Sequence, residues 1–219
     1  MRGGAVEEPF RASIPAGTRL IETFGWRPDT GATHWPRHRA RLLRSAARLG
    51  FAVTEGEPDR VVAGIDGSEA LRCRLTLDAS GRVDVTTSPA GPSPRRWRIG
   101  LAVERLCSDD PWLGVKTTQR ALYDAARAAL PAELDEVIFI NERGEVCEGT
   151  ITNIFVARAD GAHVTPPLGS GVLPGVLRAR LLEEGWSEAV LRLDDLAQAR
   201  AIWVGNSLRG LIAADWIAP

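Results

Sequence analysis

The apolar residues near the start of the chain favour a strand in one stretch and recur at helical spacing in the next. Residues 18–26 (TRLIETFGW) read as a strand. Residues 37–49 carry apolar side chains on one side at helical spacing, and Gly50 stands where a glycine commonly ends a helix. The pattern therefore predicts a strand followed by an amphipathic helix with an arginine-rich outer face.

Further strand patterns follow this helix. Residues 71–87 alternate through a turn at residues 79–81, which predicts a hairpin, and residues 97–105 are another strand candidate. These elements indicate a small α+β domain over residues 1–106. A bridge that contains proline and glycine, residues 108–114, then falls within an interdomain linker expected at residues 107–115.

The second half, residues 116–219, is predicted to be the larger domain. Thr117 or Thr118 can cap a helix that runs to Leu130, where Pro131 stops it. Pro174 and Gly175 open a later helix, with proline at a position where its missing N–H is harmless. The other elements expected here are a hairpin turning at residues 142–144, a strand at 152–158, a helix at 194–200 and a strand at 201–206. The order of elements argues for two α+β domains.

Composition narrows the possible partners. The 219 residues are 44% hydrophobic and 25% charged, which allows a real core, and the net charge of -1 lacks the basic surplus of a nucleic-acid or anionic-membrane binder. No apolar segment approaches the roughly 20 residues of a membrane-spanning helix, and no signal peptide is visible. Cys73, Cys107 and Cys147 form no Cys-x-x-Cys pair, so reduced cysteines are expected and no metal site is indicated. We expect a soluble, cytoplasmic protein that binds a small molecule, with no nucleic acid or membrane partner.

Lysine is almost absent from the chain. Lys116 is the single lysine among 27 basic residues, and the others are arginines. A bias toward arginine codons explains most of this depletion, and chance retention of one lysine is the plain alternative. Arginine stays protonated, however, and cannot replace lysine as an amine nucleophile that forms Schiff bases with carbonyl compounds. Lys116 is therefore a candidate for amine chemistry, and it lies near the expected domain junction, where cofactors commonly bind.

An aldehyde cofactor with a pyridine ring and a phosphate needs a carboxylate at its ring nitrogen and hydrogen-bond donors at its phosphate. The chain has a candidate for each. Glu148 follows a predicted strand and could present a carboxylate, although by itself it also fits a solvated acid at a strand end. The N–H groups of Val176 and Leu177 would open a helix and offer an anion site, and Asn206 with Ser207 adds a side-chain amide and a hydroxyl. Most helices begin without binding anything, so this signal alone is weak.

Five segments together carry a more specific signal, because they follow one another in the order of the signature blocks of a known family. The chain resembles the fold type IV, or class IV aminotransferase, enzymes that depend on pyridoxal 5'-phosphate (PLP) and include branched-chain aminotransferases, D-amino-acid aminotransferases and 4-amino-4-deoxychorismate lyases. The five segments are HWPRHRARLLRSAARLGF, GVKTTQRALYD, DEVIFINERGEVCEGTITNIFV, TPPLGSGVLPGVLRARLL and IWVGNSLRGLI. They cover most of the chain from Thr18 to Ile212. The resemblance implies a two-domain α+β fold with the cofactor between the domains, and a homodimer.

The resemblance also implies residue roles. Lys116 would be the Schiff-base lysine, Glu148 the partner of the pyridine nitrogen, and Arg41 the phosphate arginine. Thr23 and Arg120 would contact the substrate. The phosphate site would be completed by Val176, Leu177, Asn206 and Ser207.

Within the family the chain is most similar to the lyase branch, including the lyase domains fused to aminodeoxychorismate synthase. Branched-chain aminotransferases usually show Gly-Thr where this chain has Gly205-Asn206, and a tyrosine soon after the lysine where it has Arg120 and Ala121. The expected reaction is cleavage of 4-amino-4-deoxychorismate to 4-aminobenzoate and pyruvate in folate biosynthesis. The alternative is a class IV aminotransferase acting on branched-chain or D-amino acids. Because the chain has short ends for the family, a second alternative is a protein that keeps the fold without turnover.

Overall fold

The computed structural model describes residues 10–92 and 94–218, and the chain divides into two compact units. The first unit comprises Met1–Gly91 and Val115–Gln119, and the second comprises Pro92–Gly114 and Arg120–Pro219. This division differs from the expected boundaries at residues 106 and 116. Residues 92–106 and most of the expected linker belong to the second unit, whereas Lys116 belongs to the first.

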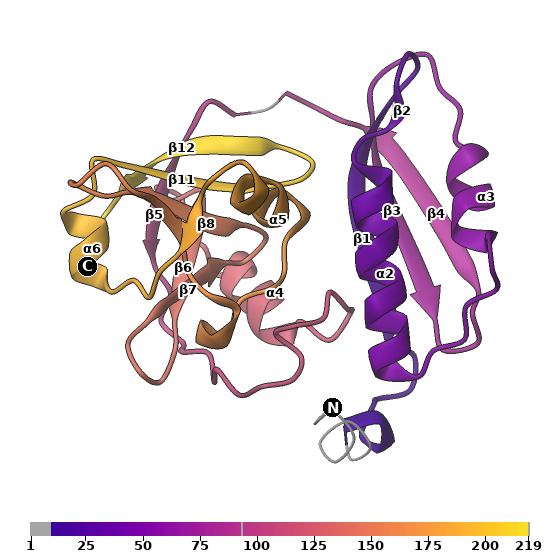
Figure 1. Ribbon diagram of the computed structural model, residues 1–219, viewed down its shortest axis with the longest axis horizontal. Coiled ribbons are helices and arrows are strands. Elements are labelled where there is room, and N and C mark those ends of the chain that lie inside the picture. Colours follow the sequence, from indigo (N-terminus) through magenta and orange to yellow (C-terminus); the bar gives the residue numbers. More distant parts are fainter. Residues whose placement is uncertain (1–9, 93, 219) are drawn as a thin grey trace. The chain divides into compact units, whose positions relative to one another are not determined.

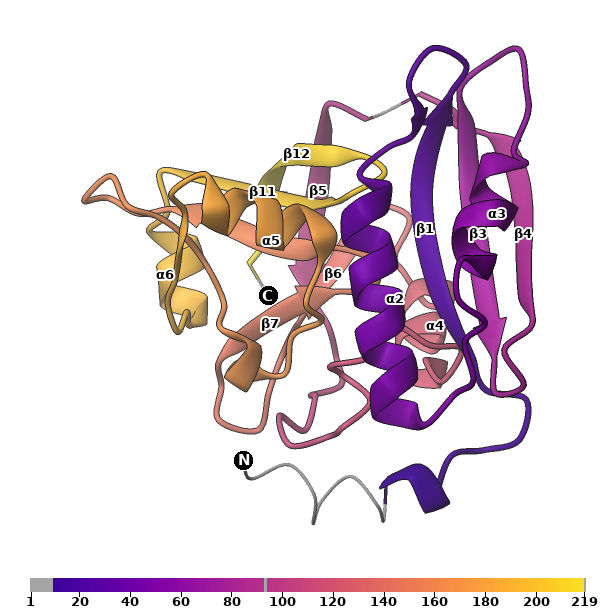
Figure 2. The same ribbon diagram turned by 45° about the vertical axis from the view of Figure 1, so that its right-hand side comes forward.

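Within its described residues, the first unit contains an antiparallel four-stranded sheet in the order β2-β1-β3-β4. The strand and helix predicted for residues 18–49 and the hairpin predicted for residues 71–87 are confirmed. The helix ends at Gly50, which has the positive φ of 72° typical of a glycine cap. The elements are β1 (Arg19–Arg27), β2 (Gly31–Ala32), α2 (Trp35–Leu49), α3 (Glu57–Ala63), β3 (Leu71–Asp78) and β4 (Val83–Pro89). Figures 1 and 2 show α2 lying along β1.

The side chains of β1 alternate between two faces. Leu20, Phe24 and Trp26 are buried on the same face as Glu22, and Phe24 contacts the rings of Trp35 and His38 on α2. This alternation places one carboxylate in an otherwise apolar row. Such a carboxylate needs a partner, because burying an isolated charge is costly.

Residues 115–119 join the edge of β1 and do not begin a helix. Thr117 forms a β-bridge with Leu20, and the N–H of Thr118 donates to Arg19 O at 2.9 Å. Thr118 Oγ1 in turn accepts from Arg19 N at 3.0 Å. The prediction that Thr117 or Thr118 caps the next helix is therefore wrong, since their hydrogen-bonding groups are committed to strand and turn contacts.

The second unit contains an eight-stranded mixed sheet, counted over the described residues, in the order β10-β9-β8-β11-β12-β5-β6-β7, with β7 also paired to β8. The predicted hairpin, the strand at 152–158 and the strand at 201–206 are confirmed. The strands are β5 (Arg96–Leu101), β6 (Glu136–Ile140), β7 (Val146–Gly149), β8 (Asn153–Ala157), β9 (His163–Thr165), β10 (Ser187–Glu188), β11 (Ala201–Asn206) and β12 (Gly210–Trp216). The helices are α4 (Ala121–Ala128), the 3-10 helix η1 (Leu168–Ser170), α5 (Val176–Glu183) and α6 (Leu193–Ala197).

The location of β5 explains why residues 92–106 belong to the second unit and not, as predicted, to the first. The strand candidate at residues 97–105 ends at Leu101, and its partners are β6 and β12, both parallel to it. Hydrogen bonds to these strands hold β5 in the second sheet. Its sequence proximity to the hairpin of the first unit misled the boundary prediction.

The core of the second unit lies on both faces of β6. Ile138 and Ile140 belong to one apolar cluster, and Val137 and Phe139 belong to another, against which α4 packs. The helix predicted to open at Pro174 begins two residues later, at Val176: Gly175 is its N-cap, so the proline precedes the cap and does not occupy the first helical position. Among the described residues, no helix has the length and apolar character of a membrane span.

Candidate functional site

Lys116 lies in the first unit, on the segment that extends the edge of β1. Its carbonyl oxygen accepts a hydrogen bond from Ile21 N at 2.8 Å, and its side chain is half-buried. Because the neighbouring residues also pair with β1, the backbone that carries the amine is fixed. The single lysine of the chain is thus attached to a sheet and not to an unconstrained linker.

A buried cluster of charged and polar side chains fills the space between β1 and α2. Arg41 donates through Nε to Glu22 Oε1 at 2.8 Å and through Nη2 to Glu22 Oε2 at 2.6 Å. His38 Nδ1 lies 2.6 Å from Glu22 Oε2. Burial alone would raise the pKa of Glu22, but the charge of Arg41 and hydrogen bonds from Arg41 and His38 outweigh it and lower this pKa to about 2. Glu22 is therefore an ionised carboxylate that fixes the guanidinium of Arg41.

The other arginines of α2 differ from Arg41. Arg41 is 6% exposed, whereas Arg39 is on the surface and pairs with Asp59 at 2.7 Å. Arg44 is exposed. The structure thus separates one buried arginine from its solvated neighbours, a distinction that the composition of the helix did not provide. Thr23 is half-buried on the opposite face of β1 from Glu22.

Glu148 lies inside β7 in the second unit and is 5% exposed. Its Oε1 accepts from the hydroxyl of Tyr123 at 2.8 Å. Its Oε2 accepts from Asn153 Nδ2 at 3.2 Å and from Leu173 N at 3.0 Å. The reading of Glu148 as a solvated acid at a strand end is therefore wrong. Hydrogen bonds of this kind stabilise the ionised form of a buried carboxylate.

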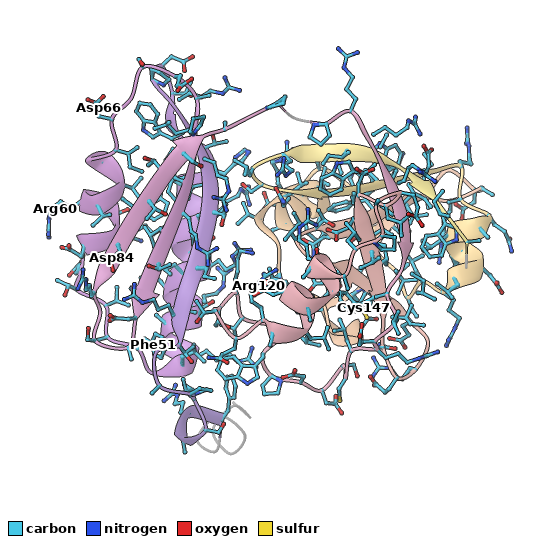
Figure 3. All side chains as sticks on the ribbon, turned by 180° about the vertical axis from the view of Figure 1, so that it is seen from behind. Phe51, Arg60, Asp66, Asp84, Arg120 and Cys147 are labelled. Carbon is cyan, nitrogen blue, oxygen red and sulfur yellow. The ribbon has the colours of Figure 1, made fainter. Side chains whose placement is uncertain are left out.

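Arg120 and Tyr123 stand at the start of α4, where Figure 3 labels Arg120. The Arg120 guanidinium lies 5.6 Å from the centre of the Tyr123 ring. Its Nε donates to Asp124 Oδ1 at 2.7 Å and its Nη2 donates to Thr150 O at 2.9 Å. Arg120, predicted to contact substrate, is therefore also anchored to the turn that follows Glu148.

A second buried carboxylate, Glu136, organises that turn. Glu136 is 0% exposed and accepts hydrogen bonds from Thr150 Oγ1 at 2.6 Å, Thr152 Oγ1 at 3.1 Å and Ile151 N at 3.2 Å. The carbonyl oxygen of Ile151 accepts from Asn206 Nδ2 at 3.1 Å. The turn between β7 and β8 thus links two residues predicted for the site, Arg120 and Asn206, through its backbone.

The predicted anion site lies at the N-terminus of α5. No side chain caps this helix at Gly175, and Val176 and Leu177 occupy its first turn. A Cβ added at Gly205 would overlap the carbonyl oxygen of Gly210 and lie 2.8 Å from Leu177 Cδ2, so the end of β11 packs closely on the helix. Asn206 and Ser207 occupy the adjoining turn, where Asn206 Oδ1 accepts from two backbone N–H groups, those of Leu208 and Arg209.

The structure therefore distributes the predicted residues over the two units. Lys116, Arg41 and Thr23 belong to the first, and the second holds Glu148, Arg120, Val176, Leu177, Asn206 and Ser207. Sequence reasoning missed Glu22, Tyr123 and Glu136. A charged residue in the apolar row of a strand was the available signal for Glu22. Among the described residues, no group of His, Cys, Asp and Glu has the arrangement of a metal site.

Comparison with known proteins relates most of the chain to one family. The sequence profile described as Amino-transferase class IV matches residues 19–216. A protein of Schizosaccharomyces pombe named "Putative aminodeoxychorismate lyase" is 28% identical over 187 residues, which are 80% of this chain and 80% of that protein.

Two solved structures are similar over nearly the full length of the chain. A crystal structure of a "Putative amino-acid aminotransferase" from Mesorhizobium loti is 46% identical, with a TM-score of 0.87, and the match covers 91% of this chain and 100% of that chain. The 4-amino-4-deoxychorismate lyase of Pseudomonas aeruginosa is 26% identical, with a TM-score of 0.76, and the match covers 90% of this chain and 82% of that chain.

Proposed function

This chain belongs to the class IV amino-transferase family, and on that premise we propose that it converts 4-amino-4-deoxychorismate to 4-aminobenzoate and pyruvate. The family depends on PLP, and the fold is the two-domain α+β fold of the type IV enzymes. The family match runs through both units, from β1 to β12.

The residues present fit PLP. Glu148 is a buried carboxylate held by hydrogen bonds, as a partner for a protonated pyridine nitrogen should be. The uncapped N-terminus of α5 suits a phosphate, and Val176, Leu177, Asn206 and Ser207 would bind it there. Arg41 would add a formal positive charge, and Lys116 would attach the cofactor.

The proposed reaction uses Lys116 and Glu148 in different ways. When bound, PLP supplies an aldehyde for the substrate amine and a ring that accepts the electron pair released at the neighbouring carbon. Lys116 Nζ would take the proton from the ring carbon that bears the amine, and Glu148 would keep the pyridine nitrogen protonated. The bond between the ring and the oxygen of the three-carbon side group would then break with its electron pair passing to that oxygen, so the six-membered ring becomes aromatic. The enolate that leaves takes up a proton, which Lys116 can return, and becomes pyruvate.

Two observations support the lyase assignment. The relative named as an aminodeoxychorismate lyase aligns over 80% of both chains, and this chain has Gly205-Asn206 where branched-chain aminotransferases usually have Gly-Thr. Lyase and aminotransferase share the steps up to proton removal, so the residues that hold PLP support both. The difference at the end of β11 favours the lyase.

The second candidate is an amino-acid aminotransferase. It is favoured by the 46% identity to the Mesorhizobium loti protein, the highest identity among the relatives compared above. This reaction would reprotonate the cofactor and transfer the amino group to a 2-oxo acid. Purified protein loaded with PLP and given 4-amino-4-deoxychorismate should release 4-aminobenzoate and pyruvate in equal amounts. Glutamate formation from branched-chain or D-amino acids and 2-oxoglutarate, without 4-aminobenzoate formation, would establish the aminotransferase instead.

The attachment of the cofactor is tested separately. Because Lys116 is the single lysine, borohydride reduction of the loaded protein should fix the pyridoxyl group at this residue, as mass mapping would reveal. Lys116→Ala should abolish turnover, and Lys116→Arg should do no better, since the charge survives without the nucleophile. Label found only on the N-terminal amine would contradict the assignment.

We further propose that the protein is a cytoplasmic homodimer, as the family resemblance implies. The three cysteines are free, and two of them, Cys73 and Cys147, are buried, which suits a reducing compartment. Sedimentation equilibrium of the loaded protein would measure the subunit number. A mass equal to one chain would contradict the dimer without bearing on the reaction.

A further inference from the structure

Tyr123 is the single tyrosine of the chain and the donor to Glu148 Oε1. It lies on the face of α4 that packs against β6, where its ring meets Phe139 edge to face with the ring centres 5.2 Å apart. The Arg120 guanidinium lies on the same ring, at 5.6 Å. Two contacts that do not involve the hydroxyl therefore fix the direction in which the hydroxyl points.

Two further contacts of Glu148 come from a different part of the fold. Asn153 Nδ2 and Leu173 N both donate to Oε2, and Asn153 Nδ2 also donates to Leu173 O at 3.1 Å. The two carboxylate oxygens thus have separate supports, one from α4 and one from β8 with the residues before α5. A carboxylate held at both oxygens has little freedom to rotate.

We propose that Tyr123 is a positioning residue for Glu148: its hydroxyl holds Oε1 so that the carboxylate keeps the orientation and the ionised state needed opposite the pyridine nitrogen. This proposal rests on the proposed function, because only a PLP enzyme requires Glu148 in that role. A phenylalanine would pack equally well against Phe139 and Arg120, so only the contact with Glu148 requires the hydroxyl of Tyr123.

The charges around Tyr123 support this role. Burial raises the pKa of Tyr123 above its usual value, and the negative charge of Glu148 and the hydrogen bond to it raise it further. Cys147 on β7 acts in the same direction, while Arg120 lowers the pKa. The raised pKa therefore favours the protonated, hydrogen-bond-donating form of the phenol at neutral pH.

The first measurement needs no cofactor. In the apoprotein, tyrosinate absorbance can come only from Tyr123, so an alkaline titration should give none before the protein unfolds. Glu148→Gln removes the negative neighbour and should bring the ionisation to a lower pH. Glu142→Gln, on the exposed hairpin turn, is the control and should leave the titration unchanged. Ionisation of wild-type Tyr123 at the pH of a free phenol would overturn the proposal.

The second measurement uses the loaded enzyme. Tyr123→Phe keeps both ring contacts and removes the hydroxyl, so the protein should still fold, with a loss of stability no larger than that of one buried hydrogen bond, while kcat falls about tenfold and KM stays nearly constant. The pH at which the bound cofactor changes its absorbance should also move. Wild-type kcat and an unchanged cofactor titration in Tyr123→Phe would mean that the ring only packs. If the wild-type chain fails to attach PLP at Lys116, the proposed function fails, whereas the apoprotein titration still reports on the contact.

Discussion

Glu22 in the first unit and Glu148 in the second are both buried carboxylates, but different kinds of groups contact them. Glu22 in the first unit binds the guanidinium of Arg41 through both oxygens, with His38 alongside. The donors to Glu148 in the second unit include a phenol, a side-chain amide and a backbone N–H. Both side chains are almost inaccessible, at 1% and 5% exposed.

Glu22 holds a cation of the chain itself, and we propose that Glu148 binds the protonated pyridine nitrogen of the cofactor. Hydrogen bonds from neutral groups stabilise an ionised carboxylate without neutralising its charge, as that proposed role requires. Glu22 already neutralises Arg41 and orients it. The contacts of Glu22 therefore fix the side chain of Arg41 in place. The contacts of Glu148 suit its proposed role of keeping a bound pyridine ring protonated.

The largest effect should come from changing the charge of Glu148. Glu148→Gln keeps a side chain of the same shape but no longer favours the protonated pyridine, so turnover should fall by about 100-fold or more while PLP still binds. Glu142→Gln, in the exposed turn of the same hairpin, is the matched control and should retain turnover. Steady-state kinetics with the cofactor-loaded variants would measure this, and unchanged turnover in Glu148→Gln would leave the carboxylate a structural role only.

Changing Glu22 should affect stability and its pH dependence. Glu22→Gln leaves Arg41 buried without a full counter-charge, so the free energy of unfolding should fall by about 3 kcal/mol. Because the pKa of Glu22 is about 2 in the folded chain and near 4.5 for a free carboxyl, its stabilisation is present above pH 4.5 and is lost as pH falls toward 2.

Denaturant unfolding at several pH values would measure both parts of this prediction. The free energy of unfolding of the wild type should fall as the pH is lowered from 4.5 toward 2. In Glu22→Gln this free energy should change less over the same range. Asp59→Asn offers a control in the same unit, because Asp59 pairs with Arg39 at the surface and should contribute less than about 1 kcal/mol. Equal losses from Glu22→Gln and Asp59→Asn would show that the buried pair has no special role.

The smallest effect expected concerns PLP affinity. Arg41→Ala would leave Glu22 uncompensated, so it is best combined with Glu22→Gln, and loss of one charge-assisted phosphate contact should weaken binding roughly ten- to a hundredfold. Glu22→Gln alone provides the reference, and Arg39→Ala and Arg44→Ala should change the dissociation constant little. A larger loss from Arg39→Ala or Arg44→Ala would mean that the phosphate arginine is another residue of α2.

Local sequence signals predicted most elements because those signals act over a few residues. The alternation of β1, the helical spacing ended by Gly50 and the turn at Gly144 all depend on backbone preferences near each residue. They failed where a distant segment competed. Thr117 and Thr118 can cap a helix as well as pair with a strand, and hydrogen bonds from β1, nearly 100 residues away, decided between the two.

For the candidate site as well, the sequence indicated some features and only the structure revealed others. The single lysine and the order of the signature segments made Lys116 and Glu148 candidates, because chemistry restricts which residue types can form a Schiff base or pair with a pyridinium. The sequence did not reveal that Arg41 is buried on Glu22, that Glu136 organises the turn after β7, or that Tyr123 supports Glu148.

By itself, then, the sequence determined the family, the cofactor chemistry and most local structure, since each is specified by residue type and short-range spacing. Only the tertiary structure decided which side chains compensate the buried carboxylates and which sheet receives β5 and residues 115–119. Those outcomes depend on pairing between residues far apart in the chain. Such pairing is chosen by the cost of leaving a buried charge or backbone group without a partner.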